Sequence, residues 1–158
     1  MNHPTFPALR RAACAAALAG VAATAFAQDP AKAPAPPAPQ IKVNFVDHSA
    51  AALIDKDTAM AVMKENIPAR VWRLYPANRY AFVSQVEGGV TGAGTCVVTA
   101  RVMMLPLTPT MKAVLFRPQK TATAFDSVAG AGREQCQAVA REKLKEATSA
   151  VVSALVKT

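Results

Sequence analysis

The chain has 158 residues, of which 52% are hydrophobic, and its 18 Lys and Arg against 10 Asp and Glu give a formal net charge of +8. The basic residues are spread along the sequence, which favours a solvated surface over a dedicated nucleic-acid-binding stripe. No internal repeat of about 20 to 50 residues is present, so the sequence does not predict a solenoid or a repeat array.

Residues 1–27 have the pattern of a cleaved export signal. Arg10 and Arg11 precede a short apolar stretch, and Ala25-Phe26-Ala27 supplies small residues for a cleavage site near Ala27. The stretch is shorter and less apolar than the roughly 20 residues of a membrane-spanning helix, which disfavours an uncleaved anchor. The paired arginines leave the twin-arginine and general secretory routes both open. We expect a periplasmic or secreted protein whose mature chain has no transmembrane segment.

Two further regions follow the predicted signal. Residues 28–40 are rich in Pro and Ala and lack large apolar side chains, so we expect a disordered, extended linker. Residues 41–158 have the length and apolar content of a single domain with one core.

The first predicted elements of this domain are a strand and a short helix. The alternation of residues 41–46 predicts a strand. Apolar residues at helical spacing predict a helix over at least 57–66, which Pro68 ends, and Ser49 or Asp55 is the candidate N-cap.

A meander is predicted next. Residues 70–75 are rich in residues that favour strands, 76–78 form a turn, and 79–87 return as a second strand of a hairpin. The glycine-rich segment 88–94 predicts another turn, and the strict alternation of 95–104 predicts the clearest strand of the chain.

The C-terminal part of the meander is interrupted by proline. After Pro106 and Pro109, residues 112–116 and 120–125 are predicted as further sheet segments. A long amphipathic helix follows Gly132, because apolar residues recur at steps of three and four: Cys136, Ala140, Leu144, Ala147, Val151 and Leu155. The predicted fold is α+β, with an antiparallel meander sheet of four to five strands, a short N-terminal helix and a long C-terminal helix packed on one face.

The cysteine positions predict a disulfide. Cleavage near Ala27 removes Cys14 and leaves Cys96 and Cys136, an even number in an oxidising compartment. Cys96 belongs to the apolar face of its strand and Cys136 to the apolar stripe of its helix. Both patterns therefore place the sulfurs in the same core.

The remaining reactive residues predict neither a catalytic centre nor a metal site. Asp47, His48 and Ser49 are the residue types of a hydrolase triad, but three consecutive residues cannot adopt its geometry. His48 and a disulfide-bonded cysteine pair provide too few ligands for zinc, and no haem-attachment motif is present. We therefore predict no cofactor.

The segment with most functional promise is rich in methionine. Its adaptable apolar side chains suit a lipidic ligand or a partner protein, although they also suit a core beneath the C-terminal helix. The residues of this candidate groove are Met103, Met104, Leu105, Leu107, Met111 and Phe116. Four basic residues are candidate contacts for an anionic group: Arg101, Lys112 and Arg117 beside the groove, and Arg133 at the start of the long helix.

The sequence thus favours a non-enzymatic, exported binding or envelope-accessory protein. Its expected partner is an anionic envelope component, a lipidic ligand or another envelope protein, and not a nucleic acid. One alternative is a small hydrolase without a histidine-based triad, which requires Glu87, Asp126 or Asp47 to meet in a concave site. The other is a structural module that oligomerises through a sheet edge.

Overall fold

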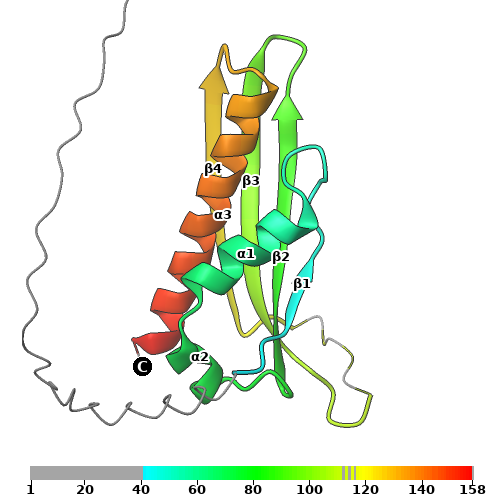
Figure 1. Cartoon of the computed structure of the whole chain (residues 1–158), viewed down its shortest axis with the longest axis vertical. Helices are drawn as coiled ribbons and strands as arrows, with labels where there is room; N and C mark the ends of the chain where they lie inside the picture. The colour runs from blue at the N-terminus through cyan, green and yellow to red at the C-terminus, as the bar shows by residue number, and fades with distance from the viewer. Residues whose placement is uncertain (1–40, 112, 114, 116, 158) are drawn as a thin grey trace, which may run out of the picture. The chain divides into compact units, whose positions relative to one another are not determined.

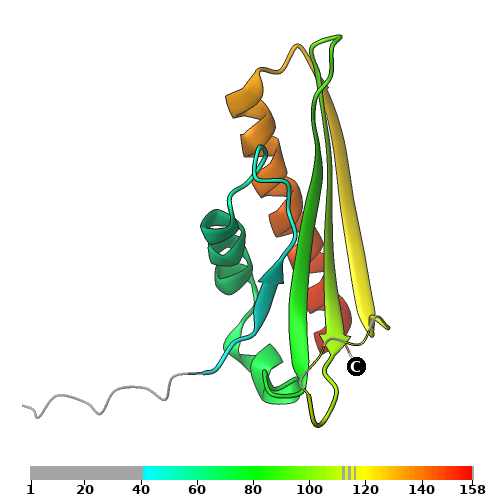
Figure 2. The same cartoon turned by 90° about the vertical axis from the view of Figure 1, so that its right-hand side faces the viewer.

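A four-stranded sheet with helices on one face forms the part of the chain that the computed structural model describes, residues 41–157 without 112, 114 and 116. Figure 1 shows the order of the elements, and Figure 2 shows the sheet with the helices on one side of it. The predicted export signal, its cleavage site and the linker lie outside the described residues.

The strands are β1 (Phe45–Asp47), β2 (Tyr80–Val90), β3 (Thr95–Pro106) and β4 (Lys120–Ala129), and they lie in this order across the sheet. β2, β3 and β4 are antiparallel, as expected for a meander. The prediction of an entirely antiparallel sheet is wrong for β1, which pairs parallel to β2 with Phe45 opposite Phe82. A parallel return requires a long crossover, and two helices between β1 and β2 provide it.

The first of these helices, α1 (Lys56–Asn66), begins at an acidic N-cap. Asp55 accepts hydrogen bonds from the hydroxyl and the backbone N–H of Thr58 at 2.7 and 2.8 Å. These bonds, the hydroxyl bond first, stabilise the carboxylate and lower the pKa of Asp55 from its usual value. The cap is therefore in its charged, bonded form at neutral pH.

The second helix, α2 (Ala69–Leu74), replaces the predicted strand over residues 70–75. Val71 and Trp72 are adjacent and both are buried. Neighbouring residues of a strand point to opposite faces, whereas neighbours on a helix lie about 100° apart and can enter the same core. Packing of these two side chains thus overrides the β propensity of the segment.

The glycines at the end of β2 also behave differently from the prediction. The strand continues through Gly88 and Gly89, and the turn occupies residues 91–94. Gly88 has a φ of 126°, and a side chain there would collide with the carbonyl oxygen of Val97 on β3. Glycine is required here for the close approach of two strands and not for a turn.

The predicted strand over residues 112–116 is not seen at its two described positions, Ala113 and Leu115, which belong to the connection between β3 and β4. Lys112 and Phe116 lie outside the described residues. This connection, residues 107–119, bonds back to the sheet: Leu107 N–H donates to the carbonyl of Arg79, and Gln119 N–H to that of Met104, at 2.8 and 2.9 Å.

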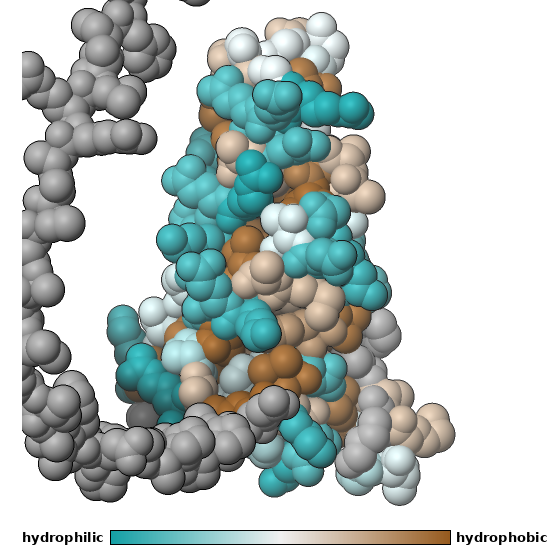
Figure 3. Space-filling view, viewed as in Figure 1, coloured by the Kyte–Doolittle hydropathy of each residue, from teal (hydrophilic) through white to brown (hydrophobic). Residues whose placement is uncertain are grey.

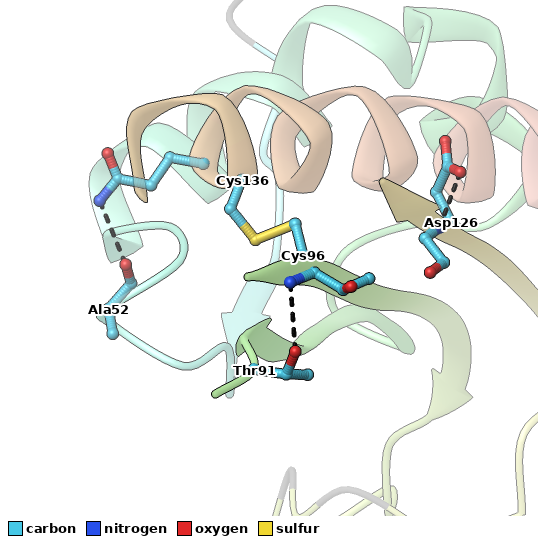
Figure 4. The surroundings of a disulfide bond; sticks show 8 residues. Ala52, Thr91, Cys96, Asp126 and Cys136 are labelled. Carbon is cyan, nitrogen blue, oxygen red and sulfur yellow. Dashed lines mark hydrogen bonds between the residues drawn. A yellow bond between two sulfur atoms is a disulfide. The ribbon is translucent and has the colours of Figure 1, made fainter. Parts of the chain in front are cut away.

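The core lies between the sheet and α3 (Arg133–Val156), and the prediction of this helix is confirmed. All six predicted stripe residues are buried: Cys136, Ala140, Leu144, Ala147, Val151 and Leu155. They pack against the alternate residues of β3 from Cys96 to Met104. The predicted disulfide is present, and it joins Cys96 to Cys136 with their Cα atoms 5.5 Å apart (Figure 4).

None of the helices in the described part of the chain has both the length and the hydropathy needed to cross a membrane.

Candidate functional site

An apolar pocket opens on the sheet face opposite α3. It has a volume of about 400 Å³ and is lined by Val46, His48, Val83, Gln85, Met103, Leu105 and Pro118. β1, β2, β3 and the β3–β4 connection therefore each contribute to its wall. Its size and its mainly apolar lining with two polar side chains are typical of small-ligand sites.

Strand alternation positions the apolar walls. Val83 and Met103 are cross-strand partners, and Leu105 lies two residues further along β3, on the same face as Met103. Met103 is half-buried, whereas Val83 and Leu105 are 5% and 3% exposed although α3 lies on the other face. Apolar residues thus occupy both faces of the sheet at this end, which is the requirement for a pocket opposite the core.

The polar side chains of the pocket lie on β2 and just after β1. Gln85 donates a hydrogen bond from Nε2 to Oε1 of Glu87 at 2.5 Å, which leaves its amide oxygen available to a ligand. His48 is exposed, and its backbone N–H is held by the carbonyl of Ser84 at 2.9 Å. The imidazole therefore projects from a backbone position fixed by the sheet.

The structure divides the predicted groove residues among several places. Met103 and Leu105 line the pocket, whereas Met104 is fully buried in the core on the α3 face. Leu107 lines a second, more polar depression with Arg79, and Met111 is 80% exposed. Phe116 lies outside the described residues. The segment is thus part pocket, part core and part exposed connection.

The basic residues predicted to contact an anion also lie apart from one another. Arg101 lies on the open sheet face opposite Gln85, and Arg117 is exposed in the β3–β4 connection. Arg133 is at the other end of the sheet, where it lines a cavity of about 220 Å³ with Gly88 and Cys136. Lys112 lies outside the described residues. The four do not form a single anion site.

The Asp47-His48-Ser49 tripeptide, at the end of β1, forms side-chain hydrogen bonds to β2. Asp47 Oδ1 accepts hydrogen bonds from the hydroxyls of Ser49 and Ser84, both at 2.6 Å. Ser49 Oγ in turn accepts from the backbone N–H of Val86 at 3.0 Å. Ser84 is fully buried, so this network satisfies a hydroxyl inside the core. The arrangement does not include the imidazole of His48.

Replacing Asp47 should therefore reduce stability. We expect Asp47→Ala to lower the free energy of unfolding by about 1 to 3 kcal/mol, because the buried Ser84 hydroxyl loses its acceptor. Urea denaturation followed by circular dichroism measures this change. Combining Asp47→Ala with Ser84→Ala should cost less than the sum of the two single changes. Additive effects would show that the two side chains are not coupled.

The acids that a hydrolase would require are dispersed. Glu87 lies on the open face of β2, whereas Asp47 bonds Ser84 on the α3 side. Asp126 lies 3.4 Å from the ammonium of Lys143 on α3, and Lys143 also bonds Glu146 at 2.8 Å. The hydrogen bond that Lys143 donates to Glu146 raises the pKa of Lys143, desolvation opposes this, and the bond to Asp126 raises it further. The acids proposed for catalysis thus belong to three separate environments.

Within the described residues, no group of three or more His, Cys, Asp or Glu side chains is placed to share a metal ion.

The end of the molecule that carries the disulfide is tied together by short polar contacts. Gln137 of α3 donates from its side chain to the carbonyl of Ala52 at 3.1 Å, and the Thr95 N–H donates to the hydroxyl of Thr91 at 3.2 Å (Figure 4). Cys96 and Cys136 lie between these contacts and are at most 1% exposed. Both cysteines at this end are joined in the disulfide, so neither is a free thiol.

Sequence reasoning missed five pocket residues, Val46, His48, Val83, Gln85 and Pro118. A signal for one of them, Val83, was present, because Ala81 and Val83 alternate with Phe82 and are apolar like the core face. A strand that is apolar on both faces is covered on both faces or binds something on one of them. The contribution of β1 depends on the parallel pairing, which no local pattern indicates.

No family model matches this chain, and no curated protein matches it. Solved structures that this chain partly resembles include a PelC dodecamer from Paraburkholderia phytofirmans, at 17% identity and a TM-score of 0.40, covering 73% of this chain and 92% of that one. Another is a candidate lipoprotein from Caulobacter crescentus, at 10% identity and a TM-score of 0.33, covering 70% of this chain and 82% of that one.

Proposed function

We propose that this chain is an exported, non-enzymatic binding protein of the cell envelope, and that its pocket holds the apolar part of a lipidic ligand. The pocket between β1, β2, β3 and the β3–β4 connection carries this proposal. Val83, Met103 and Leu105 form an apolar surface that an acyl chain can contact without hydrogen bonds. The side chains of His48 and Gln85 can form hydrogen bonds with a polar headgroup.

Two features support export. The buried disulfide is of the kind that persists in oxidising compartments, and Arg10, Arg11 and Ala25-Phe26-Ala27 have the pattern of a signal peptide. An apolar ligand in such a compartment would come from the envelope lipids. The location is therefore part of the proposal.

A variant that fills the pocket tests the ligand. We expect Met103→Trp to weaken binding of the fluorescent fatty acid dansyl-undecanoate by at least about tenfold, because the indole occupies the space of the acyl chain. Fluorescence titration measures this affinity. The parent chain should bind the probe with a blue-shifted emission, as expected for a dansyl group that leaves water.

The matched control is Val97→Trp, which adds the same side chain to the same face of β3 outside the pocket lining. It should leave the affinity for the probe unchanged. Thermal unfolding of both variants by circular dichroism verifies that each is folded. An absence of probe binding by the parent chain, or equal losses in the two variants, would refute the pocket as the ligand site.

An oligomeric structural module remains the second candidate, because β4 is an edge strand with a large exposed apolar side chain. No other strand of the described chain pairs with its outer edge, and Phe125 is 62% exposed on the open face. Lys120 and Asp126 on this strand oppose edge-to-edge pairing, since charged side chains on an edge disfavour association. The pocket therefore supports the binding function more directly.

A further inference from the structure

Four segments that are distant in sequence meet at the end of the molecule opposite the disulfide. They are residues 41–44, 68–80, 105–120 and 153–157, and we call their described part the basic pole. Leu107 N–H bonds the carbonyl of Arg79 at 2.8 Å, and the side-chain amide of Asn44 bonds the carbonyl of Ala77 at 3.4 Å. In Figures 1 and 2 the start of the described chain, α2, the β3–β4 connection and the end of α3 all lie at the lower end.

The charge of the described residues is strongly polarised toward this end. The basic pole contains no Asp or Glu among its described residues, while the rest of the described chain has seven basic residues against nine acidic ones. Every basic side chain of the pole is exposed: Lys42, Arg70, Arg73, Arg79, Arg117, Lys120 and Lys157. A charge that is spread along the sequence is therefore gathered at one end by the fold.

Exposed apolar side chains gather at the same end. Of the seven large hydrophobic residues that are exposed in the described chain, five belong to the basic pole: Ile41, Val43, Leu74, Met111 and Leu115. Met111 is 80% exposed and Leu74 is 62% exposed. Figure 3 shows apolar and hydrophilic residues side by side toward the lower end of the face in view.

The combination selects one kind of partner. Exposed cations without neighbouring acids are attracted to a negatively charged surface, and each contributes about fivefold to binding when it lies near anionic headgroups. Exposed Met and Leu side chains lower their free energy when they leave water for the boundary between headgroups and acyl chains. A nucleic acid or a soluble polyanion would bind only the basic side chains. An uncharged membrane would bind only the apolar side chains.

We propose that the basic pole docks on the surface of an anionic lipid bilayer, with Met111 and Leu115 in the headgroup region and the basic side chains on lipid phosphates. The interaction is peripheral and depends on salt, because it consists of exposed charges and a few apolar side chains. This proposal does not depend on the ligand pocket, although Leu105 and Pro118 belong to both regions.

Cosedimentation with vesicles tests the docking surface. The full chain is mixed with vesicles of phosphatidylcholine alone or with phosphatidylglycerol added, and all variants share residues 1–40, so differences among them report on the substituted positions. We expect Arg73→Gln with Arg117→Gln to weaken binding to the anionic vesicles about thirtyfold. Arg141→Gln with Lys145→Gln is the matched control, since it removes the same charge from exposed positions of α3 outside the pole.

A separate variant tests the contribution of the apolar side chains to vesicle binding. Met111→Ser should weaken binding severalfold even at a salt concentration that screens the charges, and it should leave binding to soluble dextran sulfate unchanged. Met103→Trp, which fills the pocket, should leave vesicle binding unchanged, so failure of the pocket and failure of the pole are distinguishable.

Several results would overturn the lipid surface as the partner. They are equally tight binding to uncharged and anionic vesicles, equal losses from the pole pair and the control pair, and no effect of Met111→Ser on vesicle binding. The last result would identify a soluble polyanion as the partner instead.

Discussion

Removal of the Cys96–Cys136 disulfide lowers the free energy of unfolding by about 4 kcal/mol in the chain-entropy model, because the bond closes a loop with a sequence separation of 40. The double variant Cys96→Ala and Cys136→Ala tests this expectation. Alanine is the appropriate substitute because both positions are buried, and serine would place two hydroxyls in the core. Denaturation in guanidinium chloride measures the difference.

Reduction of the parent chain provides the control. In the presence of reductant, its unfolding transition should move to nearly that of the double alanine variant, since the two then differ only by two buried thiols. Alkylation of the denatured, unreduced parent chain followed by intact mass measurement checks the bond itself. Two alkylated thiols at positions 96 and 136 would contradict the disulfide.

The second large effect is expected at Trp72, the only tryptophan of the chain. Its ring lies edge-on to Phe45 and Phe82, with centroids 5.4 and 5.1 Å away, and its side chain is 4% exposed. It therefore connects α2 to β1 and to the centre of the sheet. Trp72→Ala should lower the free energy of unfolding by about 3 to 5 kcal/mol, from lost burial and the cavity that remains.

Leu74→Ala is the matched control on the same helix. Leu74 is 62% exposed, so we expect its replacement to change the free energy of unfolding by less than about 0.5 kcal/mol. Urea denaturation followed by far-ultraviolet circular dichroism measures both variants without relying on tryptophan emission. Similar costs for Trp72→Ala and Leu74→Ala would contradict the observed orientation of α2.

These two effects concern different connections of the same core. The disulfide joins β3 to the first turn of α3, whereas Trp72 joins α2 to β1 and β2 at the opposite end. The pocket and the basic pole lie toward the Trp72 end, where the β3–β4 connection crosses beside the sheet. Loss of the disulfide should thus affect stability more than the local structure of either proposed binding surface.

Regular patterns in the sequence were sufficient for a large part of the fold. The period of α3 placed Cys136 in the core, and the alternation of β3 placed Cys96 on the same side, so the disulfide followed from two independent local patterns. The end of β2 does not follow from sequence, because glycine inside a strand and glycine in a turn look alike. The strand position of Gly88 depends on the close approach of β3, which leaves no space for a side chain.

The site was only partly predictable. Composition predicts Met103, Met104 and Leu105 as one apolar surface, but Met104 faces the core, because strand alternation sends neighbours to opposite faces. The uniform composition of the methionine-rich segment predicts a single groove. Its division between core, pocket and exposed connection depends on where β3 ends.

By itself, the sequence determined the elements whose hydrophobic period is long and regular, and hence the main core and its disulfide. Tertiary structure alone decided the helical state of α2, because Val71 and Trp72 must enter one core together, and the parallel pairing of β1, because a crossover brings it there. It also decided the pocket and the basic pole. Each is assembled from segments far apart in the chain, and no local pattern records which of them will meet.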